Sequence, residues 1–450
     1  MWRLTDFGLL WYMRAKIETY GSQMVNSAIG IHQFMPDKVW KWKILEQRIA
    51  HILSLHDYQE IRLSVLQDYG VIHHGITALM QEDEAESATE AIVNLSQPNG
   101  DLSLLTLRPE GTISVLHHTA KIIKDSDVHR FYYLGPMFRK QEGNTPSEFH
   151  QLGVELLGSD SVMSENEVIS LGMKILQGLG LKDARLRLNS YGCTSCRATY
   201  IKDMKAYLNE HENELCQHCF KTLYSNPFAD TKCADPRCSD IIEAGPRILD
   251  YLCPRCKKNF HKVMKVQANL AHQYTVRPNL LKNFAYYNET VFDLVLASRG
   301  QEQVVGGGGR YDYLSQMITG KNIPAVGFYL NIDKIFEIMD HRELFTAQDK
   351  VFSVYISSQS EDLEMMMLQI AQELHANNIK TVLSADQHSI DEDAKLALKS
   401  DCDLMLVIRD ENVREGKILL RNLIREHQDY VSLNSITDEI LLARKSLKRE

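Results

Sequence analysis

Eight of the nine cysteines in this 450-residue chain fall between positions 193 and 256, as four close pairs. Three pairs have the spacing CxxC and one has four residues between its cysteines: Cys193/Cys196, Cys216/Cys219, Cys253/Cys256 and Cys233/Cys238. Paired cysteines at this spacing in a cytosolic protein are more often thiolate ligands than disulfides. The pattern therefore predicts two zinc sites of four thiolates each, with eight reduced thiols in a helical insertion as the alternative.

A second set of chemistry-bearing residues lies on a predicted β-hairpin, residues 130–158. Its aromatic-rich first strand ends at Arg139, and a short polar loop leads into the second strand. Gln151, Gly153 and Glu155 alternate along that second strand, which places them on one face of a sheet. Burial of such a face is costly unless a ligand or partner groups satisfy it. The face is either solvated or the floor of a binding site.

A carboxylate is also presented by the segment LRPEGT, residues 107–112, where a predicted strand runs through a turn into a predicted helix. Pro109 and Gly111 restrict the backbone on either side of Glu110. A carboxylate held in a turn between packed elements is suited to meet a ligand ammonium group. Taken alone, the segment is more typical of a purely structural turn.

Bulk composition limits the class of protein. With 44% hydrophobic residues, the chain is long enough for two or three domains, each with its own core. The net charge of −9 gives no global basic footprint for nucleic acid. Charged residues interrupt the N-terminal segment, and no run of about 18 apolar residues occurs elsewhere, so neither a signal peptide nor a membrane span is expected. We therefore expect a cytoplasmic protein.

Periodicity predicts the elements that position these residues. Apolar spacing predicts a helix from Pro36 to about residue 58 and a helix over 164–180 with Ser164 and Glu167 in capping-box register. Residues 58–67 are expected to form a strand. Four glycines at 306–309 permit close backbone approach, but they lack the register of a dinucleotide fingerprint.

From about residue 349 the pattern changes to alternating strands and helices. This alternation covers about 100 residues and is typical of a separate α/β domain with a largely parallel sheet.

The pieces, in this order, resemble the histidyl-tRNA synthetase family of class II aminoacyl-tRNA synthetases over about residues 28–440. The resemblance is carried by LRPEGT at 107–112, FR at 138–139, FHQLGVE at 149–155, YYNETVF at 286–292, GGRYD at 308–312 and PAVGF at 324–328. The cysteine-rich segment is similar to that of some bacterial members.

The resemblance implies an α+β fold whose core is a six-stranded antiparallel class II synthetase-like sheet with flanking helices. It implies a catalytic core over 28–192 and 263–345, a Cys-rich helical insertion over 193–262, and an α/β anticodon-binding-like domain over 349–450. Residues 1–27 are left as an N-terminal extension. A homodimer through the first helix and strand is also implied.

Carried over position by position, the resemblance implies a histidine pocket, in which Glu110 meets the ammonium group, Gln151 and Glu155 hold the amino acid, and Tyr287 and Tyr311 face the imidazole. It also implies that Arg139 bridges the histidine carboxylate and the α-phosphate of ATP, which is bound with Mg²⁺.

The nucleotide side departs from the family pattern. Gln141 stands where the family has an acidic residue that contacts adenine, in a loop two residues shorter than the family's. Lys282 and Lys334 stand in place of catalytic and third-motif arginines, and Asn331 in place of a glycine. A lysine cannot make the planar bidentate phosphate contacts of an arginine, so each change is expected to cost about 10² in rate.

These departures lead to two hypotheses. The first is a paralogue that keeps the histidine pocket but has lost activation arginines, and that senses histidine or binds a tRNA or protein partner. The alternative is a genuine histidine-tRNA ligase that forms histidyl-adenylate from ATP and histidine and charges tRNA(His).

Overall fold

The computed structural model describes residues 33–77, 89–96, 102–124, 127–140, 146–229, 231, 233–280, 286–298, 300–345 and 351–447. The chain forms two compact units, divided between Thr346 and Ala347. The predicted site residues Gln141 and Lys282 and the extension over 1–27 lie outside the described residues. Within the described part of the chain, no helix is long and apolar enough to cross a membrane.

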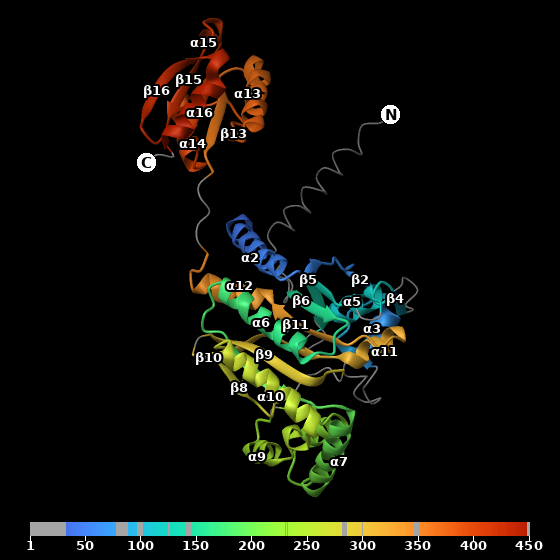
Figure 1. Cartoon of the computed structure of the whole chain (residues 1–450). Coiled ribbons are helices and arrows are strands. Elements are labelled where there is room, and N and C mark those ends of the chain that lie inside the picture. The colour runs from blue at the N-terminus through green and yellow to red at the C-terminus, as the bar shows by residue number, and fades with distance from the viewer. Residues whose placement is uncertain are drawn as a thin grey trace, which may run out of the picture. The chain divides into compact units, whose positions relative to one another are not determined.

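The first unit is built on an eight-stranded sheet (Figure 1). Its six central strands pair antiparallel in the order β5 (His129–Lys140), β6 (Pro146–Leu157), β11 (Ala325–Asn331), β10 (Gln301–Arg310), β9 (Asn288–Ser298) and β7 (Arg185–Ser190). Two short strands pair parallel at the edges, β1 (Gln59–Glu60) with β5 and β8 (Tyr274–Val276) with β7. The expected α+β class and antiparallel synthetase-like sheet are confirmed.

The predicted hairpin is present as β5 and β6, which pair without interruption from His129↔Leu157 to Lys140↔Pro146. On its other edge β6 pairs with β11, so that Glu155 lies opposite Gly327 and Gln151 opposite Asn331. The polar face predicted for β6 is therefore at the middle of the sheet rather than at an edge.

Helices α2 (Pro36–Leu55), α6 (Val162–Gly178) and α12 (Ile332–His341) pack with the sheet in one hydrophobic core cluster. The predicted capping box of α6 is wrong, because the N-cap is Ser161, which has an extended backbone and accepts a hydrogen bond from the Met163 amide at 3.2 Å. Ser164 lies inside the helix and donates to the Ser159 hydroxyl at 2.8 Å. Glu167 instead pairs with Arg130.

The predicted strand over 58–67 is also wrong. This stretch instead contains two short strands, β1 and the beginning of β2 (Leu66–Asp68), which belong to different sheets. Strand β2 pairs with β4 (Leu102–Leu107), which also pairs with β3 (Asn94–Ser96). The Arg108 guanidinium donates to the Leu63 carbonyl at 2.7 Å, so a side chain satisfies the backbone where a strand would need a neighbour. Helices α3 (Tyr69–Thr77), α5 (Thr112–Thr119) and α11 (Asp312–Thr319) pack near this small sheet.

The Cys-rich segment contains α7 (Thr194–Glu210), α8 (Gln217–Ser225), α9 (Pro236–Ala244), the 3-10 turn η2 (Ile248–Tyr251) and α10 (Pro254–Asn269). Figure 1 shows α10 running from beside the sheet into the group formed with α7 and α9. The α10 residue Gln267 is buried and donates to the Asn166 side chain of α6 at 2.9 Å. This contact ties the segment to the sheet unit.

The second unit has a five-stranded sheet in the order β13 (Lys380–Leu383), β12 (Ser353–Ser358), β14 (Leu404–Ile408), β15 (Lys417–Asn422) and β16 (His427–Ser432). Its helices are α13 (Glu364–Ala376), α14 (Ile390–Lys399), α15 (Asp410–Arg414) and α16 (Ile436–Leu447), with the 3-10 turns η3 (Glu361–Leu363) and η4 (Leu433–Ser435). The first two strand pairings are parallel and the last two antiparallel. The expected largely parallel sheet is therefore mixed, because β15 and β16 form a hairpin, which requires antiparallel strands.

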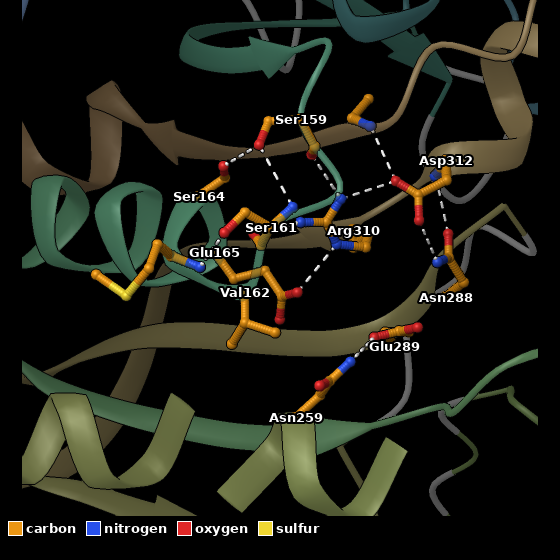
Figure 2. Close-up of polar contacts among 12 residues, drawn as sticks. Ser159, Ser161, Val162, Ser164, Glu165, Asn259, Asn288, Glu289, Arg310 and Asp312 are labelled. Atoms are coloured by element: carbon orange, nitrogen blue, oxygen red, sulfur yellow. Dashed lines mark hydrogen bonds and ion pairs between the residues drawn. The ribbon is translucent and has the colours of Figure 1, made fainter. Parts of the chain in front are cut away.

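A buried arginine joins the elements around the sheet (Figure 2). The Arg310 side chain is 2% exposed and pairs with Glu165 at 3.0 Å and with Asp312 at 2.9 Å. It also donates to the carbonyl groups of Ser159 and Ser161 at 3.0 and 3.1 Å. Arg310 thus links the end of β10 to the start of α6, with its charge neutralised by carboxylates on both sides.

We expect Glu165→Ala to lower the free energy of unfolding of this unit by about 3 kcal/mol, because it leaves a buried guanidinium short of one partner. Urea unfolding would measure the change. The control is Glu60→Ala, whose partner Arg62 is 87% exposed, and its cost should stay below about 1 kcal/mol. An equal effect of the two substitutions would contradict the structural role of Arg310.

Candidate functional site

A cleft of about 820 Å³ opens on the central strands of the first unit. Seven residues predicted from the sequence line it: Glu110, Arg139, Gln151, Glu155, Tyr287, Tyr311 and Lys334. They come from elements far apart in the chain, which the antiparallel sheet brings together. The cleft has an enclosed half around Glu110 and Glu155 and a second half around Arg139 and Lys334.

Glu110 is 3% exposed and lies at the start of α5. Its two carboxylate oxygens accept hydrogen bonds from the Thr112 and Ile113 amides at 2.7 and 2.9 Å. Burial raises the pKa of this carboxyl, and the two amide donors oppose that rise. The turn predicted from Pro109 and Gly111 therefore fixes a carboxylate by means of the helix N-terminus.

Glu155 is 2% exposed and is the second buried carboxyl of the enclosed half. It accepts hydrogen bonds from the Thr112 hydroxyl at 2.8 Å and from the Tyr311 hydroxyl. Burial, with a smaller contribution from the neighbouring Glu110, raises the pKa of Glu155 to about 8, although the hydrogen bonds from Tyr311 and Thr112 oppose the rise. A Cβ at Gly327 would lie 1.9 Å from Oε2 of Glu155, so only glycine leaves room for this carboxyl. The enclosed half is built to receive a cationic group.

Tyr133 and Thr112 belong to the site but were missed by the sequence reasoning. The Tyr133 ring fills the space above two glycines, since a Cβ at Gly111 or Gly153 would lie 2.2 or 2.0 Å from its Cζ atom. Its hydroxyl accepts a hydrogen bond from the Gln151 amide group at 3.1 Å. Glycines in two motifs were the available signal, because each marks a place where another group approaches closely.

Three tyrosines form one wall of the enclosed half, which we call the tyrosine wall: Tyr286, Tyr287 and Tyr311. The Tyr286 ring lies 4.9 Å from that of Tyr287 and 6.0 Å from that of Tyr311, centroid to centroid. All three are buried. Flat aromatic surfaces beside a carboxyl suit a planar or cationic ring.

The second half of the cleft carries exposed and half-buried charges. Arg139 donates from Nε to the Pro109 carbonyl at 2.8 Å, and its guanidinium lies 5.0 Å from the Phe149 ring centroid. Lys334 is exposed, and its ammonium group lies 3.4 Å from the Val304 carbonyl oxygen. Asn331 caps α12 by accepting a hydrogen bond from the Lys334 amide at 2.9 Å.

The eight paired cysteines form two groups of four. The first thiol cluster consists of Cys193, Cys196, Cys253 and Cys256, and the second thiol cluster of Cys216, Cys219, Cys233 and Cys238. Within each cluster all sulfur atoms lie within 4.8 Å of one another. The sequence pattern left open which pairs meet; the structure joins the first pair to the last and the two middle pairs to each other.

The donor set fits zinc. Sulfur atoms at about 2.3 Å from a tetrahedral ion are about 3.8 Å apart, and the Cys193–Cys196 and Cys216–Cys233 sulfurs lie 3.6 and 3.8 Å apart. Although burial opposes it, amide and thiol donors lower the pKa of Cys193 to about 6. The Cys219 amide lowers the pKa of Cys216 to about 7. Both therefore supply thiolates near neutral pH.

Two family models match the chain. The model described as histidyl-tRNA synthetase matches residues 30–209 and 251–335, and the model described as anticodon binding domain matches 350–441. The first thiol cluster falls within the matched ranges, whereas the second lies in the unmatched segment between them.

Curated proteins similar to this chain include histidine–tRNA ligases. That of Halothermothrix orenii is 31% identical over 92% of this chain and 99% of the relative, and that of Caldicellulosiruptor bescii is 28% identical over 91% and 96%.

Two solved structures show the same fold. The apo histidyl-tRNA synthetase of S. aureus has a TM-score of 0.74 at 23% identity, covering 93% of this chain and all of that one. An ATP phosphoribosyltransferase regulatory subunit/histidyl-tRNA synthetase from Bacillus halodurans C has a TM-score of 0.59 at 20% identity, covering 86% and 98%.

Protein purified under reducing conditions should carry about two zinc ions per chain, because each cluster offers a full tetrahedral set of sulfurs. Inductively coupled plasma mass spectrometry measures the zinc content per chain. Removal of the metal by a chelator should lower the melting temperature, since metal binding is coupled to folding. A content below about one zinc per chain would count against two sites.

The raised pKa of Glu155 predicts a pH-dependent stability. In the folded chain the pKa of this carboxyl is about 8, whereas in the unfolded chain it has its ordinary value of 4.5. The contribution of protonated Glu155 to the free energy of unfolding is thus fully present below pH 4.5 and is lost as the pH rises towards 8. Wild-type protein should therefore lose stability relative to Glu155→Gln by about 1.4 kcal/mol per pH unit in this window.

Urea unfolding of both proteins between pH 5 and pH 8 would test this. The exposed Glu210, changed to Gln, is the control and should give a difference that hardly varies with pH. A constant difference for Glu155→Gln would show that its carboxyl is ionised throughout.

Proposed function

The chain belongs to the histidyl-tRNA synthetase family of class II aminoacyl-tRNA synthetases, and we propose that it binds histidine in the enclosed half of its cleft while activating it only weakly with ATP. The observation that carries the proposal is the pair of buried carboxyls, Glu110 and Glu155, beside the tyrosine wall. Two buried carboxyls in contact with one cleft call for a cationic ligand.

Histidine supplies both the cation and the ring. Its ammonium group would meet Glu110, which the start of α5 already holds in place. Gln151 and Glu155 would contact the amino acid, and Tyr287 and Tyr311 would flank the imidazole. Because the Tyr311 hydroxyl donates a hydrogen bond to Glu155, the tyrosine ring and the carboxyl are positioned together. This arrangement discriminates against side chains that leave the buried polar groups unpaired.

Activation requires that ATP lie in the second half of the cleft. Arg139 and Lys334 would face its phosphates, with Lys282 and Gln141 as further predicted contacts. Glu148 and Glu337 line this half and are carboxylates of the kind that hold Mg²⁺ together with phosphates. A flexible ammonium at Lys334 cannot fix a phosphate as a guanidinium does, so the transition state would be less well stabilised.

The role that follows is that of a histidine-sensing paralogue that binds a tRNA or protein partner. The match of residues 350–441 to an anticodon binding domain supports an RNA partner. We also propose a cytoplasmic homodimer. The cytoplasmic location is supported by the eight paired cysteines, which stay reduced only in a reducing compartment. The homodimer is supported by the exposed apolar side chains of Leu55, Val65 and Leu66 near the first helix and strand.

A genuine histidine-tRNA ligase is the second candidate. It is favoured by the 31% identity that extends over 99% of a histidine–tRNA ligase. Arg139, which the ligase chemistry needs at the α-phosphate, is also present in the cleft.

Histidine-dependent exchange of pyrophosphate into ATP separates the two candidates. We expect slow exchange by the wild type and an increase of about tenfold or more in the double variant Lys282→Arg/Lys334→Arg, because guanidinium groups restore bidentate phosphate contacts. The control is Lys174→Arg, on the exposed side of α6, which should leave the rate unchanged. Rapid exchange by the wild type would establish the ligase, and no gain in the double variant would place the defect elsewhere.

A further inference from the structure

The first thiol cluster lies where two helices begin. Cys193 is the N-cap of α7 and Cys253 the N-cap of α10. The Cys253 amide donates to the Cys196 sulfur at 3.1 Å, so the two helix starts are in direct contact. An ion held by the four sulfurs would fix these starts relative to each other, because metal binding is coupled to local folding.

Side chains that neighbour these cysteines hold the start of β9. Arg197, one residue after a cluster cysteine, donates to the Tyr287 carbonyl at 2.9 Å. Arg255, between the two cysteines of the other pair, donates to Glu289 at 3.0 Å. Asn259 donates to the second oxygen of the same carboxylate at 3.3 Å (Figure 2). Both helices thus donate hydrogen bonds to this segment, α7 to Tyr287 and α10 to Glu289.

Glu289 has a backbone that needs such support. Its φ is +49°, in the left-handed region that a residue with a side chain rarely adopts. Its amide donates to the Gly192 carbonyl at 3.0 Å, and its carbonyl accepts from the Tyr191 amide at 2.7 Å. Gly192 itself packs on the cluster, since a Cβ there would lie 2.6 Å from Cβ of Cys196. The cluster is therefore one residue away from the hydrogen bonds that hold the start of β9.

The start of β9 also positions the tyrosine wall. Tyr286 and Tyr287 line the cleft directly before it, and their rings lie 6.0 and 6.4 Å from that of Tyr311. Tyr311 in turn donates to Glu155. A shift of the start of β9 would displace the tyrosine wall from the buried carboxyl of Glu155. A misplacement of about 1 Å in a binding site is enough to weaken it severely.

The second thiol cluster has a different location. It joins Cys216, the N-cap of α8, to Cys238 of α9, within residues 216–238. It provides a matched comparison, because Cys216 and Cys253 are both N-cap residues and both half-buried.

We propose that the ion of the first thiol cluster positions the tyrosine wall of the amino-acid pocket through Arg197 and Glu289, and that the ion of the second serves only the insertion. Arg197 and Glu289 are positioning residues, since they act through Tyr287. The inference rests on the proposed binding of histidine by this pocket.

The test measures zinc content and histidine affinity, the latter by calorimetry, on Cys253→Ser and Cys216→Ser. Each variant should lose about one zinc ion. Cys253→Ser should bind histidine about tenfold or more weakly, as disturbance of groups around a metal site typically does. Cys216→Ser should retain affinity within about twofold, because its cluster reaches the start of β9 through ring contacts of Phe228 with Tyr191 and Arg197 rather than through hydrogen bonds to the strand.

A second pair of variants separates positioning from metal loss. Arg197→Ala should keep both zinc ions and remain folded, with a somewhat lower melting temperature because a buried hydrogen bond is lost, yet bind histidine about tenfold more weakly. Arg197→Lys should recover part of the affinity. The matched control is Lys202→Ala, at an exposed position of the same helix, which should bind as the wild type does.

The outcomes distinguish the two claims. A wild type that does not bind histidine would overturn the proposed function. A wild type that binds histidine, with Cys253→Ser depleted of one zinc but unchanged in affinity, would overturn the coupling alone. Equal weakening by Cys216→Ser and Cys253→Ser, or full affinity in Arg197→Ala, would also overturn it.

Discussion

The cost of burying two carboxyls side by side governs the architecture of this cleft. Glu110 is fixed by the start of α5 and Glu155 by the hydroxyls of Thr112 and Tyr311. Gly327 leaves the space that Glu155 occupies. Without a ligand, the pKa of Glu155 is raised to about 8 by burial. Its ionised form is therefore stabilised only when a cation binds beside it. The central strands, the turn before α5 and the tyrosine wall all serve to hold this arrangement.

The two halves of the cleft differ in how firmly they are built. The enclosed half has buried groups with defined partners, as the Gln151–Tyr133 bond illustrates. In the other half, Arg139 is held by the Pro109 carbonyl at 2.8 Å, whereas Lys334 is exposed and has one long contact to a backbone carbonyl. Under the proposed function, amino-acid recognition would depend on the first half and reaction with ATP on the second. On that proposal, changes confined to the second half would leave histidine recognition intact while lowering the rate of activation.

Much of the site could be predicted because sheet alternation and motif position are local properties of the sequence. Gln151 and Glu155 share a face for this reason, and the β5–β6 hairpin follows from the pattern of its residues. Spacing within a cysteine pair is also local, but which pairs meet depends on how α7 and α10 pack, so the composition of the thiol clusters was left open. Tyr133 was missed because its role depends on glycines distant in sequence. The N-cap at Ser161 was missed because Ser164 offered an equally good pattern three residues later.

The central claim is that the pocket recognises histidine independently of nucleotide chemistry. Calorimetric titration of histidine into zinc-replete protein without ATP tests it most directly. The account predicts saturable binding with one histidine per chain, abolished when Glu110 is changed to Ala. The absence of saturable heat from folded, zinc-replete protein would contradict it.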